Sequence, residues 1–169
     1  MAEQTELEIA ERQLTHQWEQ ESATTLKVLR AYPDDQSELQ PHPRTKTARD
    51  LGWMFTLEMK LVGAAVDGTL DLSRAFTPAP ATLAEVVSAF ESGRQELLET
   101  LRRATPEQLG GTVKFFIAPK TMGDVPLVEF AWFILHDQIH HRGQFSIYLR
   151  MAGGKVPSIY GPSADEPWF

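Results

Sequence analysis

The sequence predicts an all-α protein, a four-helix bundle in one domain. Four long segments repeat apolar residues every three or four positions, the spacing of a helix with one buried face. Stretches that contain Pro and Gly separate these segments, and no internal repeat divides the chain. With 169 residues and 42% hydrophobic content, the chain has about what one compact domain with its own core requires. We therefore expect residues 1–169 to form a single bundle domain.

The first predicted helix spans Thr5 to Ala31 and stops before Pro33. Further prolines in the connection that follows disfavour helix. Either Thr45 or Thr47 is expected to cap the second helix, which runs from Thr47 to Val66. The apolar positions that predict the buried face of the first helix are Leu7, Ala10, Leu14, Trp18, Leu26 and Leu29.

The third predicted helix opens with a capping box. In "TLAE", Thr82 and Glu85 have the Thr-x-x-Glu spacing in which each side chain accepts a hydrogen bond from the other residue's backbone. This helix is expected to reach Ala104. Directly after it, Thr105 and Pro106 are able to start one further helical turn.

A short extended segment is expected between the third and fourth helices, at Val113 to Ile117. The fourth helix is expected from Val125 to Ala152, because the pair Gly153-Gly154 suits a left-handed cap. The tail beyond it is expected to fold back over the bundle as an ordered loop, with a dimer contact as the alternative. Its apolar side chains, which need burial, are Val156, Ile159, Tyr160, Trp168 and Phe169.

Charge and composition exclude several classes of function. The net charge is −7, and the Lys and Arg residues are scattered, so we expect no binding to nucleic acid or to an anionic membrane. No apolar run is long enough to span a bilayer, and the polar, acidic N-terminus is unlike a signal peptide, which predicts a cytoplasmic protein. The chain has no cysteine, so any thiol chemistry must use a thiol from a cofactor or substrate.

The stretch "HDQIHHRGQ", residues 136–144, holds three of the five histidines and is a candidate metal site on the fourth helix, with a polar patch or a hydrogen-bonded pair as the alternative. At 100° per residue, His141 lies on the apolar face of this helix, and Asp137 lies one turn away on the same side. His136 and His140 form a second i, i+4 pair on another side, and they are further candidate ligands. A buried aspartate and histidine each need a partner, which is either a divalent cation or a hydrogen bond.

The second helix offers a third ligand. Its inward face, centred on Met54, carries Glu58, whose carboxylate would complete a set of oxygen and nitrogen donors with Asp137 and His141. Such a set suits Zn, Fe, Mn or Ni. Two alternatives without metal are open: Glu58 pairs with Arg142, or it bonds His141 directly.

Three stretches of the chain resemble the DinB/YfiT-like superfamily of putative metalloenzymes. They are "HHRGQFSIYLRMAGGKVPSIYGPSADE" at residues 140–166, "TARDLGWMFTLE" at residues 47–58, and the first connection "LKVLRAYPDDQSELQPHPRTKTARDL". The resemblance implies an up-down-down-up four-helix bundle and a homodimer. It also implies a divalent metal held by two ligands at i and i+4 of the fourth helix and by one from the second helix.

Carried over by position, the fourth-helix ligands fall on Asp137 and His141. A carboxylate at the first position is like the glutamate of the mycothiol-dependent isomerase branch. The second-helix ligand of the family is usually a histidine after a tryptophan, but here Trp53 is followed by Met54. Because a thioether is a poor ligand for the harder divalent ions, the site is rebuilt around Glu58 or His136, weakened, or empty.

The resemblance implies a metal-dependent thiol S-transferase that acts on small molecules, with bacillithiol, mycothiol or glutathione as the thiol. In that function Asp137 and His141 hold the metal, Glu58 is a ligand or a general base, and Tyr148 orients the substrate. A hydrolase is a further enzymatic interpretation. The alternative from another class is a metal-free, non-catalytic bundle that dimerises or binds a small ligand.

Overall fold

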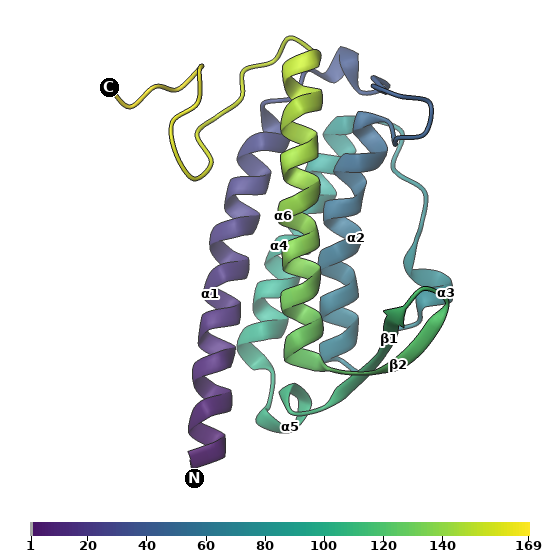
Figure 1. Ribbon diagram of the computed structural model, residues 1–169, viewed down its shortest axis with the longest axis vertical. Helices are drawn as coiled ribbons and strands as arrows, with labels where there is room; N and C mark the ends of the chain where they lie inside the picture. Colours follow the sequence, from purple (N-terminus) through teal and green to yellow (C-terminus); the bar gives the residue numbers. More distant parts are fainter. Residues whose placement is uncertain (1) are drawn as a thin grey trace.

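The structure is a computed structural model that describes residues 2–169, with the side chains of residues 2–8, 10 and 11 outside the description. Leu7 and Ala10, two of the predicted core positions, therefore lie outside the described side chains. Four long helices make up most of the fold (Figure 1). They are α1 (Ala2–Arg30), α2 (Ala48–Val66), α4 (Leu83–Arg103) and α6 (Leu127–Met151).

The four long helices pack side by side around one core. Helix α2 packs against α4 and α6, and α1 packs against the same two helices, so α1 and α2 are diagonal partners. In Figure 1, α1 and α6 run upward and α2 and α4 run downward. Phe55 of α2 lies at the centre, with edge contacts to Phe90 of α4 and Phe145 of α6 at ring distances of 6.3 and 5.7 Å. Burial of such aromatic rings, together with the aliphatic side chains of the core, stabilises the bundle.

Local signals correctly predicted most of the caps, but α6 begins at Leu127 rather than at the expected Val125, because Val125 and Pro126 end the strand that precedes it. Thr47 caps α2 by accepting from the Asp50 N–H, and Thr82 and Glu85 form the expected capping box of α4. Thr105 starts the single turn α5 (Pro106–Leu109) with a second capping box. Gly153 follows α6 with a φ of +79°, the left-handed conformation that glycine adopts without strain. Helix α1 begins at Ala2, earlier than the expected Thr5.

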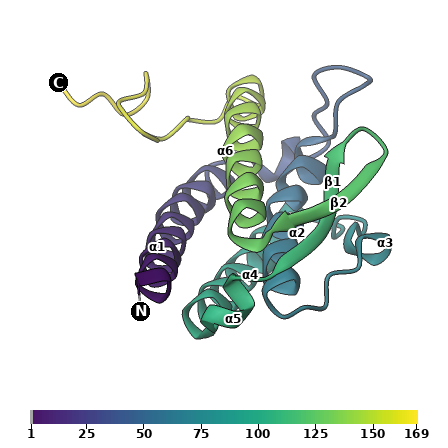
Figure 2. The ribbon, with the colours of Figure 1, turned by 60° about the horizontal axis from the view of Figure 1, so that its bottom comes forward.

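The expected all-α fold class is wrong, because an antiparallel hairpin joins α5 to α6. Its strands are β1 (Thr112–Ala118) and β2 (Thr121–Pro126). Figures 1 and 2 show the hairpin beside α2 and the first turns of α6. Two short helical segments complete the described chain, η1 (Asp34–Gln36) and α3 (Leu72–Ala75).

The hairpin forms because packing and cross-strand pairing act together on a segment whose sequence pattern is weak. Val113 is buried, and Phe115 stacks edge-on against Phe130 of α6 with ring centres 4.9 Å apart. Across the two strands, Lys114 and Asp124 pair at 2.8 Å. Sequence periodicity showed the extended character of β1, but it did not show the partner strand.

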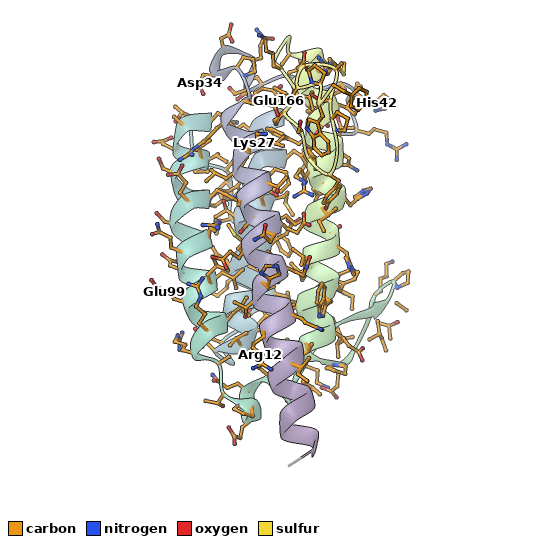
Figure 3. The ribbon with its side chains drawn as sticks, turned by 90° about the vertical axis from the view of Figure 1, so that its left-hand side faces the viewer. Arg12, Lys27, Asp34, His42, Glu99 and Glu166 are labelled. Atoms are coloured by element: carbon orange, nitrogen blue, oxygen red, sulfur yellow. The ribbon has the colours of Figure 1, made fainter. Side chains whose placement is uncertain are left out.

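The tail after α6 turns back as an ordered loop beside the later turns of α1, where it contacts Glu21 and Lys27. Lys27 of α1 contacts Glu166 at 2.9 Å, and these two residues lie at the same end of the molecule in Figure 3. The predicted burial of the apolar tail residues is only partly correct. Val156 and Ile159 are partly buried, but Tyr160, Trp168 and Phe169 are exposed.

Candidate metal centre

Three of the candidate ligands from the sequence lie close to one another between α2 and α6. Glu58 of α2 and Asp137 and His141 of α6 each offer one ligand atom, and these atoms all lie within 4.8 Å of one another. The i, i+4 spacing places Asp137 and His141 on one side of α6, and the packing of α2 against α6 brings Glu58 to them. Two facing helices therefore bring together three side chains that could hold a metal ion.

Glu58 is the buried member of the cluster, with 1% of its surface exposed. One carboxylate oxygen, Oε1, lies 2.5 Å from Nδ1 of His141. The other oxygen, Oε2, is buried without a hydrogen-bond partner. Burial raises the pKa of Glu58 to about 7, although the bond to His141 acts in the opposite direction. An unpartnered buried carboxylate oxygen is unfavourable, so this atom requires an explanation.

His141 connects the buried carboxylate to the more exposed one. Its Nδ1 faces Glu58, and its Nε2 lies 4.0 Å from Oδ1 of Asp137, whose side chain is 41% exposed. The hydrogen bond with Glu58 is the main cause that raises the pKa of His141, and Asp137 adds to the rise while burial opposes it. Of the two metal-free alternatives, the structure contains the direct bond between Glu58 and His141.

The residues present fit a divalent cation. The donors are one imidazole nitrogen and carboxylate oxygens, a set that zinc and related ions accept. The orphaned Oε2 of Glu58 would gain a partner, which removes the penalty for its burial. Ligand atoms around a tetrahedral ion are roughly 3.3 Å apart, given bond lengths of about 2.0–2.1 Å. The 2.5 Å contact between Glu58 and His141 is shorter than this spacing and the 4.0 Å separation of His141 from Asp137 is longer, so both contacts change when a cation binds.

His136 and His140 do not join this cluster. Both are exposed on another side of α6. The ring of His136 lies 6.0 Å from that of Trp132, and Nε2 of His140 lies 2.8 Å from the side-chain amide nitrogen of Gln144. The structure therefore separates this second i, i+4 pair from the ligands around Glu58.

Tyr148 lines a pocket of about 760 Å³ that opens beside His141. Its hydroxyl donates to the carbonyl oxygen of Lys46 at 3.2 Å, so the tyrosine fastens the connection between α1 and α2 to α6. The ring is nearly buried and forms part of the pocket wall. Tyr148, expected to orient a substrate, therefore lines this pocket, and its hydroxyl is already paired to the backbone.

Two buried polar residues of α6 were not predicted from the sequence. Arg142 is 1% exposed and pairs with Glu21 of α1 at 2.7 Å, which excludes the suggested pairing with Glu58. Gln138 is completely buried and donates to the carbonyl of Phe55. A signal was present, because both residues share a helix face with the buried Ala131, Leu135, Phe145 and Leu149.

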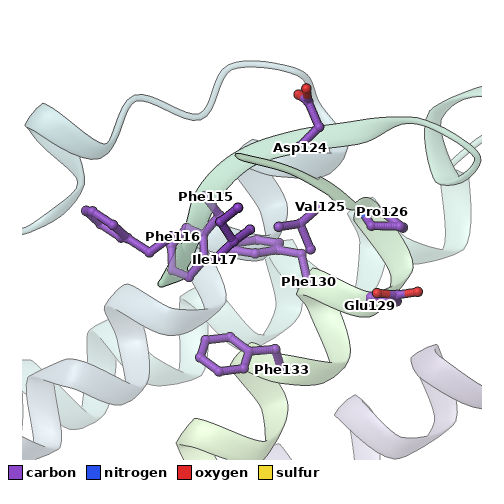
Figure 4. A pocket seen from close by; sticks show the side chains of 9 residues that line it. All are labelled: Phe115, Phe116, Ile117, Asp124, Val125, Pro126, Glu129, Phe130 and Phe133. Atoms are coloured by element: carbon purple, nitrogen blue, oxygen red, sulfur yellow. The ribbon is translucent and has the colours of Figure 1, made fainter. Parts of the chain in front are cut away.

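A second pocket, of about 390 Å³, lies between the hairpin and the start of α6. Figure 4 shows its aromatic side chains, including Phe115, Phe130 and Phe133, with Asp124 apart from the rings. It shares no lining residue with the pocket beside His141. No residue of the metal cluster belongs to it, so it carries no part of the candidate centre.

The fold and the site define a class of protein, a helical bundle with a candidate divalent-metal site between two antiparallel helices. Comparison with known proteins gives the family. A sequence profile described as the DinB family matches residues 1–168, and the chain belongs to that family. Over the part of the chain that the structure describes, no helix is long and apolar enough to cross a membrane.

Individual relatives are similar in sequence or in fold. The uncharacterized protein YrdA of Bacillus subtilis (strain 168) is 23% identical over 150 residues, which is 88% of this chain and 87% of YrdA. A DinB-like protein of Bacillus cereus ATCC 10987 superposes with a TM-score of 0.73 and 21% identity, over 87% of this chain and 95% of that one. For the DinB-like protein YjoA of B. subtilis the TM-score is 0.70 and the identity 15%, with coverages of 87% and 97%. At these identities the likeness of the structures shows the fold alone.

Proposed function

We propose that this protein is a divalent-metal-dependent enzyme that acts on small molecules, with transfer of an external thiol as the reaction. The observation that carries the proposal is the buried Oε2 of Glu58, which lacks a partner inside a cluster with Asp137 and His141. A cation supplies that partner and also neutralises the carboxylates. The pocket beside His141 provides the room for a substrate.

The chain's own residues have distinct roles in this proposal. Glu58, Asp137 and His141 hold the cation between α2 and α6. When bound, the cation lowers the pKa of a thiol or a water molecule in the pocket, so that a nucleophile is present at neutral pH. The thiol comes from a second molecule, because the chain has no cysteine. Tyr148 holds the pocket wall in place through its bond to Lys46.

Metal content measured by elemental mass spectrometry on tag-free protein tests the proposal. The wild-type protein is expected to hold close to one Zn, Ni, Fe or Mn ion per chain, with Glu58→Gln, Asp137→Asn and His141→Ala each reducing that content strongly. His140→Ala is the matched control, since His140 lies outside the cluster and should leave the metal content unchanged. An equal loss of metal in His140→Ala would exclude the site. Wild-type protein that binds none of these ions after incubation with them would also exclude it.

The reaction is tested with the loaded protein. Thiols such as bacillithiol and glutathione are combined with small electrophiles, and product is expected only with metal-loaded wild type and His140→Ala. Product formed equally by Glu58→Gln would show that the activity does not depend on this cluster. The homodimer implied by the family resemblance is part of the same proposal, and light scattering should give twice the mass of one chain.

A metal-free protein that binds a small ligand is the second candidate function. One observation favours it: Glu58 and His141 already bond each other at 2.5 Å, so each has a partner without a cation. Met54 in the place of the family's histidine agrees with this candidate. The two candidates predict opposite metal contents in the mass-spectrometry experiment. The second candidate requires that the pocket beside His141 binds a ligand while Glu58, Asp137 and His141 hold no metal.

A further inference from the structure

The pocket beside His141 is walled by cationic and apolar side chains together. Its lining comes from α2, from α6 and from the connection between α1 and α2 (residues 31–47), which contributes Arg44, Thr45 and Lys46. Leu51 and Ile147 supply apolar surface, and His141 places the metal cluster at the pocket wall. Among the side chains that the structure describes, no acidic one lines this pocket. It therefore presents positive charge and apolar surface next to the candidate centre.

The two cations of this pocket are unusual for an acidic protein. The chain carries 23 acidic and 16 basic residues, so acidic side chains outnumber basic ones over the sequence as a whole. Among the side chains that the structure describes, neither Arg44 nor Lys46 takes part in an ion pair. Arg44 and Lys46 line the same pocket as His141. Both charges are thus available to a ligand in the pocket.

Hydrogen bonds hold the cationic connection over the pocket. Thr45 closes a tight turn onto the carbonyl of His42 at 2.8 Å, and the side chain of Gln40 donates to the carbonyl of Thr45 at 2.6 Å. Tyr148 then fixes the carbonyl of Lys46 to α6. Because the backbone on either side of Arg44 is already ordered, binding of a ligand requires no further ordering of this connection.

We propose that this pocket binds a small molecule that carries an oxyanion group, a carboxylate or a phosphate, held by Arg44 and Lys46. The apolar part of the ligand packs on Leu51 and Ile147. A guanidinium offers paired N–H donors that match the two oxygens of such a group, and an ammonium adds a point charge. That the ligand's reacting group points toward His141 and the metal cluster rests on the proposed function. Binding of the ligand's oxyanion group by Arg44 and Lys46 does not.

Calorimetric titration of metal-free protein with matched probes tests this inference. The probes are 4-phenylbutyrate and phenyl phosphate, with 4-phenylbutanol as the neutral counterpart. At low salt, both anions are expected to bind about fivefold or more tightly than the alcohol, a preference that falls at high salt because exposed charges are screened. The ratio of the two anion affinities then distinguishes a carboxylate site from a phosphate site.

Variants of Arg44 and Lys46 test whether these two residues cause the preference for anions. Arg44→Gln/Lys46→Gln is expected to remove the preference for the anions while leaving binding of the alcohol unchanged. The control Lys120→Gln/Lys155→Gln removes the same number of charges from exposed positions outside the pocket, and should keep the preference. All four side chains are exposed, so these substitutions should not disturb folding, which circular dichroism checks.

Three results would overturn the inference. They are an equal loss of preference in the control, equal binding of anions and alcohol by the wild type, and no binding of either anion at roughly 10 mM. Failure of the proposed function gives a different pattern, because metal-free protein would still prefer the anions through Arg44 and Lys46. Conversely, protein that binds metal without any preference for anions would support the proposed function and exclude this inference.

Discussion

Met54 is the residue at which this chain departs most clearly from its family. It is half-buried on the same face of α2 as Glu58, one helical turn away, where the resemblance places a histidine ligand. A histidine there would add an imidazole donor to the cluster of carboxylates and His141. We therefore expect Met54→His to tighten Zn binding by about tenfold, an additional free energy of about 1.4 kcal/mol.

Competition with a chromogenic chelator measures this change. Met54→Leu is the matched control, because leucine has a similar volume and no donor atom, and it should bind Zn as the wild type does. If histidine and leucine at this position give the same affinity, the face of α2 around Met54 does not reach the metal cluster.

Arg142 is a charged residue inside the core, and its burial makes it sensitive to the loss of a partner. Its guanidinium contacts the Glu21 carboxylate, the Glu21 carbonyl and the Tyr160 hydroxyl. Arg142→Met leaves Glu21 nearly buried without its counter-charge, which should lower the free energy of unfolding by about 3 kcal/mol. Urea denaturation followed by circular dichroism measures it. The double variant Arg142→Met/Glu21→Leu should recover most of the loss, and no recovery would mean that the ion pair is not the cause.

At the residue scale, the sequence predicted ligands within one helix better than contacts between helices. Asp137 and His141 were predictable as a pair because the geometry of α6 alone places them one turn apart. The partner of Glu58 was left open between His141 and Arg142, since it depends on how α2 and α6 are aligned in the bundle. That alignment comes from the packing of side chains such as Phe55 and Phe145, which no local pattern contains.

At the element scale, the same distinction separates the helix ends from the hairpin. A cap involves residues within one turn, so Thr82 and Glu85 were recognisable in the sequence. The strands β1 and β2 depend on pairing with each other and on the contact of Phe115 with α6. Their short, largely exposed segments carry a weak alternation of apolar residues, which is why an all-α fold was expected.

The tail is an element held by charges, so its attachment should depend on pH. Asp165 accepts from Arg150 and from the Val156 N–H, and the bond with Arg150 is the main cause that lowers the pKa of this carboxyl. A lowered pKa means that the contribution to stability is present above the unfolded value of about 3.9 and is lost as the pH falls through the folded value. We expect the amide proton shift of Val156 in NMR spectra to titrate with a midpoint below about 3.9.

Asp165→Asn provides the control for this titration. Without the carboxyl group, the Val156 amide should show no such transition, while other tail amides keep theirs. A midpoint at or above the ordinary aspartate value in the wild type would mean that the contact with Arg150 does not stabilise the charged form.

At the scale of the whole molecule, buried polar groups connect the bundle across its core. Arg142 reaches the Thr25 hydroxyl at 3.4 Å, and that hydroxyl lies 3.4 Å from the Gln138 side chain, which bonds the backbone of α2 at Phe55. These contacts join α1, α6 and α2 in one layer. They require each helix to keep its position along the bundle, because a shift by one turn would leave the polar groups unpaired.

The metal cluster joins two helices that are far apart in the sequence, so binding should stabilise the whole fold. Glu58 belongs to α2 and His141 to α6, and the unfolded chain does not hold them together. Zn at one hundred times its dissociation constant should add about 2.7 kcal/mol to the free energy of unfolding. For a chain of this length that corresponds to a rise in melting temperature of roughly 5–10 °C. Differential scanning calorimetry with Zn and with EDTA measures it, and Glu58→Gln should show no rise because it removes the ligand from α2. A rise of the same size in Glu58→Gln would show that Zn acts elsewhere on the protein, since exposed residues such as His136 and His140 remain in that variant.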